Sequence, residues 1–333
     1  MPRAVARSRK SVRPSRAGAA IDVRTLEIFV AVSQSQSMTA AARRLGITQP
    51  AVSFAIAHLE KALGTPLVDR STRPLRATPA GQVLLRRAAR VLADIAQLRG
   101  SVHQAAGRPL PNLRIGIVAS VTALGAPLVL ALQALADELR IWSTLTPDLR
   151  AALIERKLDV LITSESLEDV PSLVHRVVLR EPFVLAIPRD FAIARRTSTL
   201  ASLCESLPLI RYTSRSNIGE EIERYLRRRR VNAPRQLELD TSTAVHDMVA
   251  AGLGWAMTTP LCLLQSGVSL DAVALRPLDG APLRRSLRVI ARDSELPGAV
   301  DRIGDLVSGL AQGVLAERLR GRNAWLLRDV AFE

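Results

Sequence analysis

The sequence predicts a multidomain α/β protein: an N-terminal all-α winged helix-turn-helix, a long linker helix and a C-terminal α/β region. Three observations predict it. Three amphipathic helical segments, of which the second and third end at glycines, fill residues 23–63, and a seven-residue apolar repeat runs through residues 84–105. From residue 113 onward, apolar β-branched segments alternate with helical ones. With 333 residues, the chain is long enough for two or three domains.

Composition narrows the class of protein. Apolar residues make up 48% of the chain, which is enough to build buried cores, and no apolar run reaches 18 residues, so we expect no membrane-spanning helix. Two cysteines are too few for a disulfide scaffold. The basic first twenty residues contain no apolar core of an export signal. We therefore expect a reducing, cytoplasmic location and no membrane partner.

The positive charge is concentrated in the first third of the chain. Residues 1–110 carry 18 basic and 5 acidic side chains, which is +13 of the total +15. Residues 1–20 are rich in Arg, Ser and Ala and are expected to form a flexible basic arm. This asymmetry indicates an anionic partner, with nucleic acid first and an acidic membrane surface second.

Capping residues and glycines delimit the first three expected helices. Apolar positions recur on one face of residues 23–34. Ser37 or Thr39 can cap a second, short helix, and Gly46 suits the left-handed position after it. Thr48 can cap a third helix that runs to about residue 63.

The third helix is predicted to have two different faces. One face is a buried stripe with spacings of 4, 3 and 4: Val52, Ile56, Leu59 and Leu63. The opposite face carries Pro50, Phe54, Ala57 and Lys61, flanked by Gln49 and Ser53. A short helix, a glycine turn and a longer helix of this kind are typical of a helix-turn-helix, whose second helix enters the major groove. An ordinary α-helical hairpin is the alternative.

A basic loop and a long helix follow. Residues 64–78 contain two prolines and three arginines, and we expect a small β-wing whose Arg70, Arg73 and Arg76 reach phosphates; a solvated loop is the alternative. Thr78-Pro79 predicts the start of a helix. Its apolar repeat predicts a coiled-coil seam about 32 Å long, which favours a dimer that reads an inverted repeat. The seam residues are Leu84, Ala88, Val91, Ile95, Leu98 and Val102.

The remainder predicts a parallel sheet covered by helices. We expect a hinge at residues 107–111, a strand at 113–119 and a helix marked by leucines from Leu124 to Leu139. Further strands are expected at 139–143, 158–163, 183–187, 209–212, 236–240 and 287–291, and helices at 149–157, 220–229 and 297–320. Phosphate-loop, dinucleotide and nucleophile-elbow motifs are absent, and the four histidines form no metal-spaced cluster. We expect no catalytic residue, no metal and no cofactor, and hence no enzyme.

The first 110 residues resemble the LysR-type transcriptional regulators of bacteria. The resemblance lies in the run from Thr39 to Ser53 (TAAARRLGITQPAVS), in Leu59-Glu60, in the segment LGTPL at 63–67 and in TPAG at 78–81. A weaker match continues to about residue 320 through LRIG at 113–116, LDV at 158–160 and VAAGLG at 249–254.

The resemblance implies a winged helix-turn-helix at 21–78, a dimerisation helix and hinge at 79–111 and an effector-binding domain at 112–320. The flexible basic arm 1–20 and the C-terminal tail 321–333 lie outside it. It also implies that the effector domain is like a periplasmic binding protein, with lobe I at about 112–180 and 268–320 and lobe II at about 181–267.

The resemblance also implies the places where DNA is contacted. They are Thr39, Gln49, Pro50, Ser53, Phe54 and Arg70 of the wing, and we expect Thr48 and Arg73 to contact DNA as well. Phe54 departs from the family pattern, in which a basic or polar residue is commoner. It can pack on a thymine methyl group or weaken binding, and we hypothesise that it alters sequence preference.

An effector site is implied where strands end at the cleft between the lobes. Ser120, Thr146, Ser216 and Asn217 follow expected strands, and Arg211 can supply a positive charge. Hydroxyl groups and helix N-termini facing one cleft suit a small anion such as a carboxylate. Ordinary capping and turn residues are the alternative for each of them.

The predicted function is that of a sequence-specific regulator that reads an inverted repeat as a dimer or tetramer under the control of a small anion. Its expected partners are double-stranded DNA, further copies of itself and the effector, with RNA polymerase as a further partner. Two other classes stay open. One is a DNA-binding protein without sequence preference, and the other is a solute-binding or enzymatic α/β protein with an accessory N-terminal domain.

Overall fold

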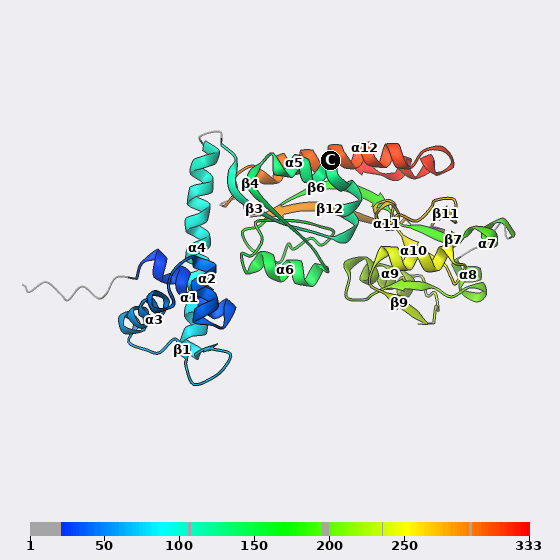
Figure 1. The fold of residues 1–333 in the computed structure, drawn as a ribbon. Coiled ribbons are helices and arrows are strands. Elements are labelled where there is room, and N and C mark those ends of the chain that lie inside the picture. The colour runs from blue at the N-terminus through cyan, green and yellow to red at the C-terminus, as the bar shows by residue number, and fades with distance from the viewer. Residues whose placement is uncertain (1–20, 106–107, 195–199, 235, 281, 293–294) are drawn as a thin grey trace, which may run out of the picture. The chain divides into compact units, whose positions relative to one another are not determined.

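The structure is a computed structural model in which residues 21–105, 108–194, 200–234, 236–280, 282–292 and 295–333 are described (Figure 1). The chain divides into an N-terminal unit, residues 1–96, and a C-terminal unit, residues 97–333. We take each unit by itself. The expected basic arm 1–20 lies outside the described residues, as does the start of the expected hinge.

Three helices form the body of the N-terminal unit, and a side-chain cap sets where each of them begins. Ser37 Oγ accepts the N–H of Ala40 and Thr48 Oγ1 that of Ala51, so these two expected caps are confirmed. Gly46 adopts the left-handed conformation that ends the second helix. The helices are α1 (Val23–Ser35), α2 (Met38–Leu45) and α3 (Gln49–Leu63).

The expected stripe of α3 is buried except at its end. Val52, Ile56 and Leu59 are buried in the core of this unit, whereas Leu63 is 39% exposed. Leu63 is the last residue of the helix and precedes the turn at Gly64, so its side chain lies beyond the reach of α1 and α2. The prediction of a four-residue stripe was therefore wrong at Leu63.

A two-stranded wing follows α3 and is held from two sides. β1 (Val68–Asp69) pairs antiparallel with β2 (Arg76–Ala77). The Glu60 carboxylate accepts the N–H groups of Leu67 (2.9 Å) and Val68 (3.2 Å), which ties the wing to α3. On the other side, a Cβ on Gly81 would lie 2.0 Å from the Leu67 carbonyl oxygen, so only glycine fits this close approach.

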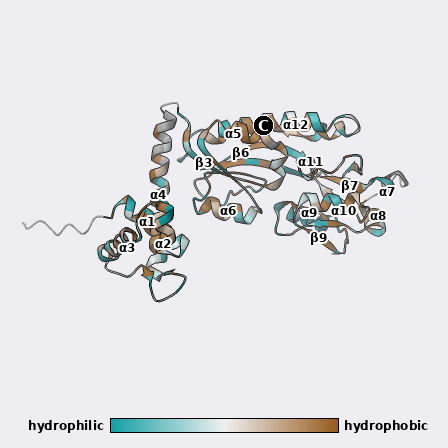
Figure 2. Ribbon diagram, in the orientation of Figure 1, coloured by the Kyte–Doolittle hydropathy of each residue, from teal (hydrophilic) through white to brown (hydrophobic). Residues whose placement is uncertain are grey.

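The long helix α4 (Pro79–Ala105) carries the expected seven-residue repeat, in which apolar residues recur among polar ones (Figure 2). Its first half covers the core of its own unit: Ala88 is buried and Leu84 half-buried there. Farther along, Val91, Leu98 and Val102 are exposed and Ile95 is half-buried. The expectation of one continuous intermolecular seam is corrected, because its first two members pack within the unit.

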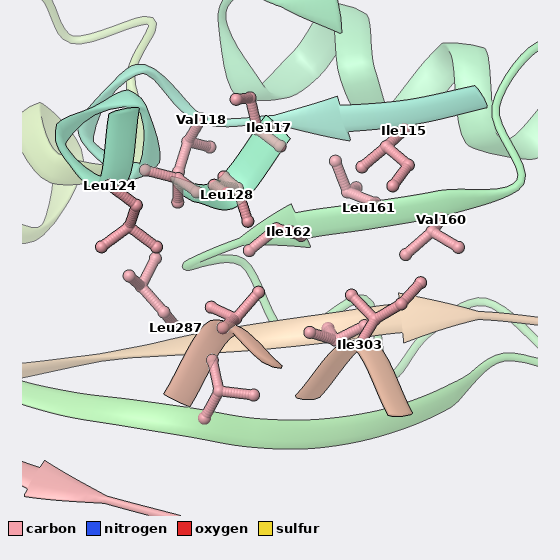
Figure 3. Packing of buried hydrophobic residues seen from close by; sticks show 14 of the residues in the cluster. Ile115, Ile117, Val118, Leu124, Leu128, Val160, Leu161, Ile162, Leu287 and Ile303 are labelled. Carbon is pink, nitrogen blue, oxygen red and sulfur yellow. The ribbon is translucent and has the colours of Figure 1, made fainter. Parts of the chain in front are cut away.

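Lobe I of the C-terminal unit is a six-stranded mixed sheet in the order β13-β6-β12-β5-β3-β4. α12 packs along β6 and β12 (Figure 1). Ile115, Leu161, Leu287 and Ile303 belong to the buried core between strands and helices (Figure 3). The strands are β3 (Leu110–Ile117), β4 (Ala136–Ser143), β5 (Val160–Thr163), β6 (Val174–Pro182), β12 (Arg284–Ala291) and β13 (Ala331–Phe332). The helices are η1 (Ala119–Leu124), α5 (Gly125–Gln133), α6 (Thr146–Ile154), α12 (Ala299–Arg318) and η2 (Gly321–Asp329).

Lobe II has its own core, in which Trp255 is fully buried. Its antiparallel sheet has the order β10-β7-β11, and β8 pairs in parallel with β9. The strands are β7 (Val184–Pro188), β8 (Ile210–Tyr212), β9 (Leu237–Leu239), β10 (Ala256–Thr258) and β11 (Val273–Pro277). The helices are α7 (Arg189–Ala194), α8 (Leu200–Ser206), α9 (Asn217–Arg228) and α10 (Ser242–Ala250). The helix α11 (Pro260–Ser266) joins the two lobes, because Leu261, Leu263 and Leu264 are buried in the lobe I core and Cys262 in that of lobe II.

Several expected elements differ in the structure. The helix expected to reach Leu139 ends at Gln133, because Leu139 pairs with Leu113 in the sheet and strand pairing outweighs the helical spacing of the leucines. The expected parallel sheet is mixed, since β12 returns from lobe II and runs antiparallel to β5 and β6. Beyond the expected return near residue 268, Val268, Leu270 and Leu275 pack against the lobe I core, while the strand β11 pairs with β7.

The C-terminal tail is part of lobe I. β13 adds a short strand to β6, and Leu326 is fully buried in the lobe I core. Two ion pairs attach the tail: Arg180 with Glu333 at 2.5 Å and Arg284 with Asp329 at 3.1 Å. The tail therefore covers the edge that β6 would otherwise expose.

Candidate nucleic-acid interface and ligand pocket

The N-terminal unit presents the predicted DNA-contacting residues on its surface. Along α3, Gln49, Pro50 and Phe54 are exposed and Ser53 is half-buried. Four further predicted residues are exposed: Thr39 at the start of α2, Thr48 at the cap of α3, and Arg70 and Arg73 in the loop of the wing. A helix N-terminus with polar side chains, next to a basic wing, has the shape and chemistry of a major-groove reader.

Arg70 has an internal partner that the sequence analysis did not assign. Its guanidinium lies 3.1 Å from the Glu60 carboxylate, which also holds the wing backbone. Arg73 and Arg76 are exposed without such a partner among the described residues. The sequence analysis quoted Glu60 within the family resemblance but assigned it no partner, because the wing brings both the backbone groups and Arg70 to it.

In the C-terminal unit, a pocket lies where strands from both lobes end. Its walls come from residues that follow β3, β4 and β5 in lobe I and β8 and β9 in lobe II. Such a crevice at the carboxyl ends of strands is the usual ligand site of α/β proteins. Polar lining residues are Ser120, Thr144, Thr146, Ser164, Tyr212, Ser216, Asn217, Asp240, Ser242 and Arg285.

The predicted pocket residues separate into four that line the pocket and one that does not. Ser120, Thr146, Ser216 and Asn217 are brought together there. Arg211 instead turns away, and its buried guanidinium donates to the Glu223 carboxylate and to the Ala233 carbonyl oxygen. The expectation that Arg211 faces the cleft was therefore wrong, because its own lobe provides its acidic partner.

Arg285 is the positive charge at the pocket. Its Nε donates to Glu181 at 2.7 Å and its Nη2 to Ser120 Oγ at 3.0 Å. Both members of the Arg285–Glu181 pair are almost fully buried. Burial alone would lower the pKa of Arg285, but the acidic neighbours Cys262, Glu181 and Glu221 outweigh it and raise that pKa. The guanidinium is thus a permanent cation.

A signal for Arg285 does exist in the sequence. Along β12, alternate residues Arg285, Leu287 and Val289 share one buried face. An arginine on the same strand face as buried apolar residues needs a buried counter-charge. This alternation could have distinguished Arg285 from its neighbour Arg284, which lies on the opposite face. Its counter-charge, Glu181, lies at the end of β6, a strand that the sequence analysis did not predict.

Tyr212 of the lobe II wall belongs to a chain of uncharged hydrogen-bonding groups, and Asp240 is the acidic side chain of that wall. Tyr212 Oη lies 3.0 Å from Thr258 Oγ1, which lies 2.9 Å from His246 Nε2. Burial raises the pKa of the Tyr212 phenol above its ordinary value and lowers the pKa of His246 to about 4, so both are neutral at pH 7. Burial raises the pKa of Glu221, and this effect is larger than the opposite effects of Arg285 and Asn217, which lower that pKa. Asn217 donates to Ser164 Oγ at 2.8 Å, across the two lobes.

Other site chemistry is limited in the part of the chain that the structure describes. Cys262 is buried at the pocket and Cys204 is half-buried in α8, and both are free thiols. No group of three metal-ligating side chains occurs among these residues. None of their helices is both long and apolar enough to cross a membrane.

Comparison with known proteins identifies the family. The model of the bacterial regulatory helix-turn-helix protein, lysR family, matches residues 23–82, and that of the LysR substrate binding domain matches residues 106–311. The HTH-type transcriptional regulator BudR of Raoultella terrigena is 28% identical over 85% of this chain and 98% of its own. The small neutral protease regulatory protein of Streptomyces coelicolor is 33% identical over 82% of each chain.

Solved structures share the fold. A full-length OxyR variant from Pseudomonas aeruginosa matches with a TM-score of 0.66 at 22% identity, over 86% of this chain and 95% of its own. CbnR complexed with its target DNA matches with a TM-score of 0.60 at 20% identity, over 87% and 100%. The curated relatives are named as regulators and not as enzymes, in agreement with the prediction. The chain belongs to the LysR family and is a DNA-binding transcriptional regulator with an effector-binding domain.

Proposed function

We propose that this regulator binds an interrupted inverted repeat as a dimer or tetramer and that a small anion in the pocket controls it. The exposed start of α3, at Gln49, Pro50, Ser53 and Phe54, would meet base edges, with Thr39 and Thr48 beside it. Arg70 and Arg73 of the wing would contact phosphates. Such a protein works in the cytoplasm, and RNA polymerase is a further proposed partner.

Pairing of two copies would use the second half of α4. Val91, Leu98 and Val102 are exposed apolar side chains spaced 7 and 4 residues apart, which places them on one side of the helix. A second copy of the helix would cover this stripe and place two α3 helices about a twofold axis.

The single observation that carries the effector proposal is the buried cation Arg285, which donates to Ser120 at the pocket wall. The N-termini of α6, α9 and α10 also begin at this pocket, at Thr146, Ser216 and Ser242. Hydroxyl groups and helix N-termini around a permanent cation favour a small carboxylate or phosphate. Such a ligand would shift the regulator only if it bound two lobe arrangements with different affinity.

Selection of sites from a random double-stranded DNA pool, with the full chain at near-physiological salt, tests the DNA part of the proposal. We expect enrichment of an interrupted inverted repeat; binding without enrichment would favour the non-specific alternative. Thermal shift with a panel of small carboxylates and phosphates tests the effector part. Ser120→Ala should weaken any stabilisation by a ligand, whereas Ser202→Ala, in α8 outside the pocket lining, should not.

A further inference from the structure

The exposed face of α3 is unusual in its lack of charge. From Gln49 to Ala57, no exposed residue of this helix is ionisable, and the first exposed charge is Lys61, near its end. In the middle of this face stands Phe54, which is 75% exposed. That is the largest exposure among the large apolar side chains that the structure describes. A phenyl ring left in water at this place therefore calls for a partner in the bound state.

The ring of Phe54 lies beside that of its neighbour one turn later. The rings of Phe54 and His58 are nearly parallel, at an interplanar angle of 16°, with centroids 6.5 Å apart. His58 is half-buried. Together the two rings form what we call the aromatic ridge of α3.

Positive charge is supplied from the elements beside α3. Arg43 and Arg44 are exposed at the end of α2, and Arg73 and Arg76 are exposed in the wing. These four side chains can meet phosphates on either side of a groove, and such contacts carry no direct sequence information. The aromatic ridge is thus free to contact base edges, with Gln49 and Ser53 as hydrogen-bonding groups next to it.

Among the four bases, thymine alone presents a methyl group in the major groove. Phe54 has neither a donor nor an acceptor, so a methyl group is the base feature with which it interacts favourably. We propose that Phe54 determines specificity by packing on the C5-methyl group of a thymine in each half-site, with His58 as the residue that positions its ring. This inference rests on the proposed reading of DNA by α3.

The contact has a measurable size. Removing one methyl group from a hydrophobic contact weakens binding about fourfold, and two half-sites together give a factor of about 15. Replacing thymine by deoxyuridine removes this methyl group and leaves base pairing and every hydrogen-bonding group unchanged. The substitution therefore isolates the proposed contact from the rest of the interface.

The experiment uses the full chain and a DNA site obtained by selection, with each thymine replaced in turn by deoxyuridine and affinity measured by fluorescence anisotropy. We expect one thymine per half-site at which the substitution weakens binding about fourfold. Phe54→Ala should bind both DNAs equally at that position, and His58→Ala should reduce the difference between the two DNAs. Val23→Ala, a matched exposed apolar residue on α1, should keep the full difference.

Two outcomes overturn the inference in different ways. If wild type prefers its selected site but tolerates deoxyuridine at every position, or if Phe54→Ala keeps the full penalty, the methyl contact is refuted and the proposed function stands. If wild type binds DNA without any sequence preference, the proposed function fails and this inference fails with it. Circular dichroism of Phe54→Ala checks that the exposed substitution leaves the fold intact.

Discussion

The ion pair at the pocket can be tested by replacing Glu181 with Gln. Glu181 is fully buried; its carboxylate accepts from Arg285 at 2.7 Å and from the Leu261 backbone N–H at 2.9 Å. Gln keeps the shape and one acceptor oxygen but removes the charge and turns an NH₂ group toward existing donors. Arg285 then keeps Ser120 as its hydrogen-bond acceptor and loses its paired negative charge.

The expected loss of stability follows from burial. Removing one partner of a buried ion pair costs about 3–5 kcal/mol, because a desolvated charge is left without compensation. Combining Glu181→Gln with Arg285→Met removes both charges, so the double variant should be more stable than the sum of the two single losses predicts, by at least about 1 kcal/mol. Glu138→Gln is the matched control, since Glu138 pairs with Arg140 on the surface, where both side chains are more than half exposed. It should change stability by less than about 1 kcal/mol.

The assay is urea unfolding of the full chain followed by tryptophan fluorescence. All three tryptophans, Trp142, Trp255 and Trp325, belong to the C-terminal unit, so the signal reports that unit alone. If Glu181→Gln cost no more than Glu138→Gln, or if the losses in the double variant were simply additive, the argument that Arg285 depends on a buried counter-charge would be refuted.

Three further predictions concern stability. Gly81→Ala should destabilise the N-terminal unit by about 1–3 kcal/mol, because the new Cβ meets the wing backbone. The control Gly313→Ala, in open space on α12, should not destabilise the protein. Equal effects of the two variants in calorimetry would contradict this prediction. Burial lowers the pKa of His246 to about 4 in the folded state, against about 6.5 in the unfolded state, so the unfolded state binds the proton first as the pH falls. The free energy of unfolding should therefore fall by about 3 kcal/mol between pH 7 and pH 4. In urea unfolding, His246→Gln should show a smaller pH dependence of stability than wild type, and an equal pH dependence would refute the role of His246. Leu326→Ala should lower the free energy of unfolding, measured by tryptophan fluorescence, by about 2–5 kcal/mol, because Leu326 docks the tail on lobe I. Leu253→Ala, at an exposed residue, should lower it by at most about 0.5 kcal/mol. Similar values for both variants would show that the tail is not docked.

Local signals predicted the helix-turn-helix well. The caps Ser37 and Thr48, the turn at Gly46 and the apolar and exposed faces of α3 depend on residues within a few positions of one another. Such short-range rules follow from helix geometry and need no knowledge of the rest of the chain. The four pocket residues that follow strands, Ser120 among them, were found for a similar reason, because strand ends meet at one edge of a sheet.

The errors occur where residues distant in sequence meet. The choice between Arg211 and Arg285 depended on which acidic side chain each arginine meets, Glu223 for the first and Glu181 for the second. Leu84 and Ala88 followed the same repeat as Leu98, yet the former pair covers the core of its own unit. A periodic pattern shows which face of a helix is apolar, but not which surface covers it.

The sequence by itself determined the class of protein, the position and polarity of α3, and the concentration of positive charge near the N-terminus. Tertiary structure decided the mixed order of the lobe I sheet, the docking of the tail on β6, the anchoring of the wing by Glu60 and the cation of the pocket. The physical reason is the range of the interactions. Helix periods and caps act over three or four residues, whereas a buried charge needs a partner that the fold places beside it. For Arg285 this partner comes from β6, about a hundred residues away in sequence.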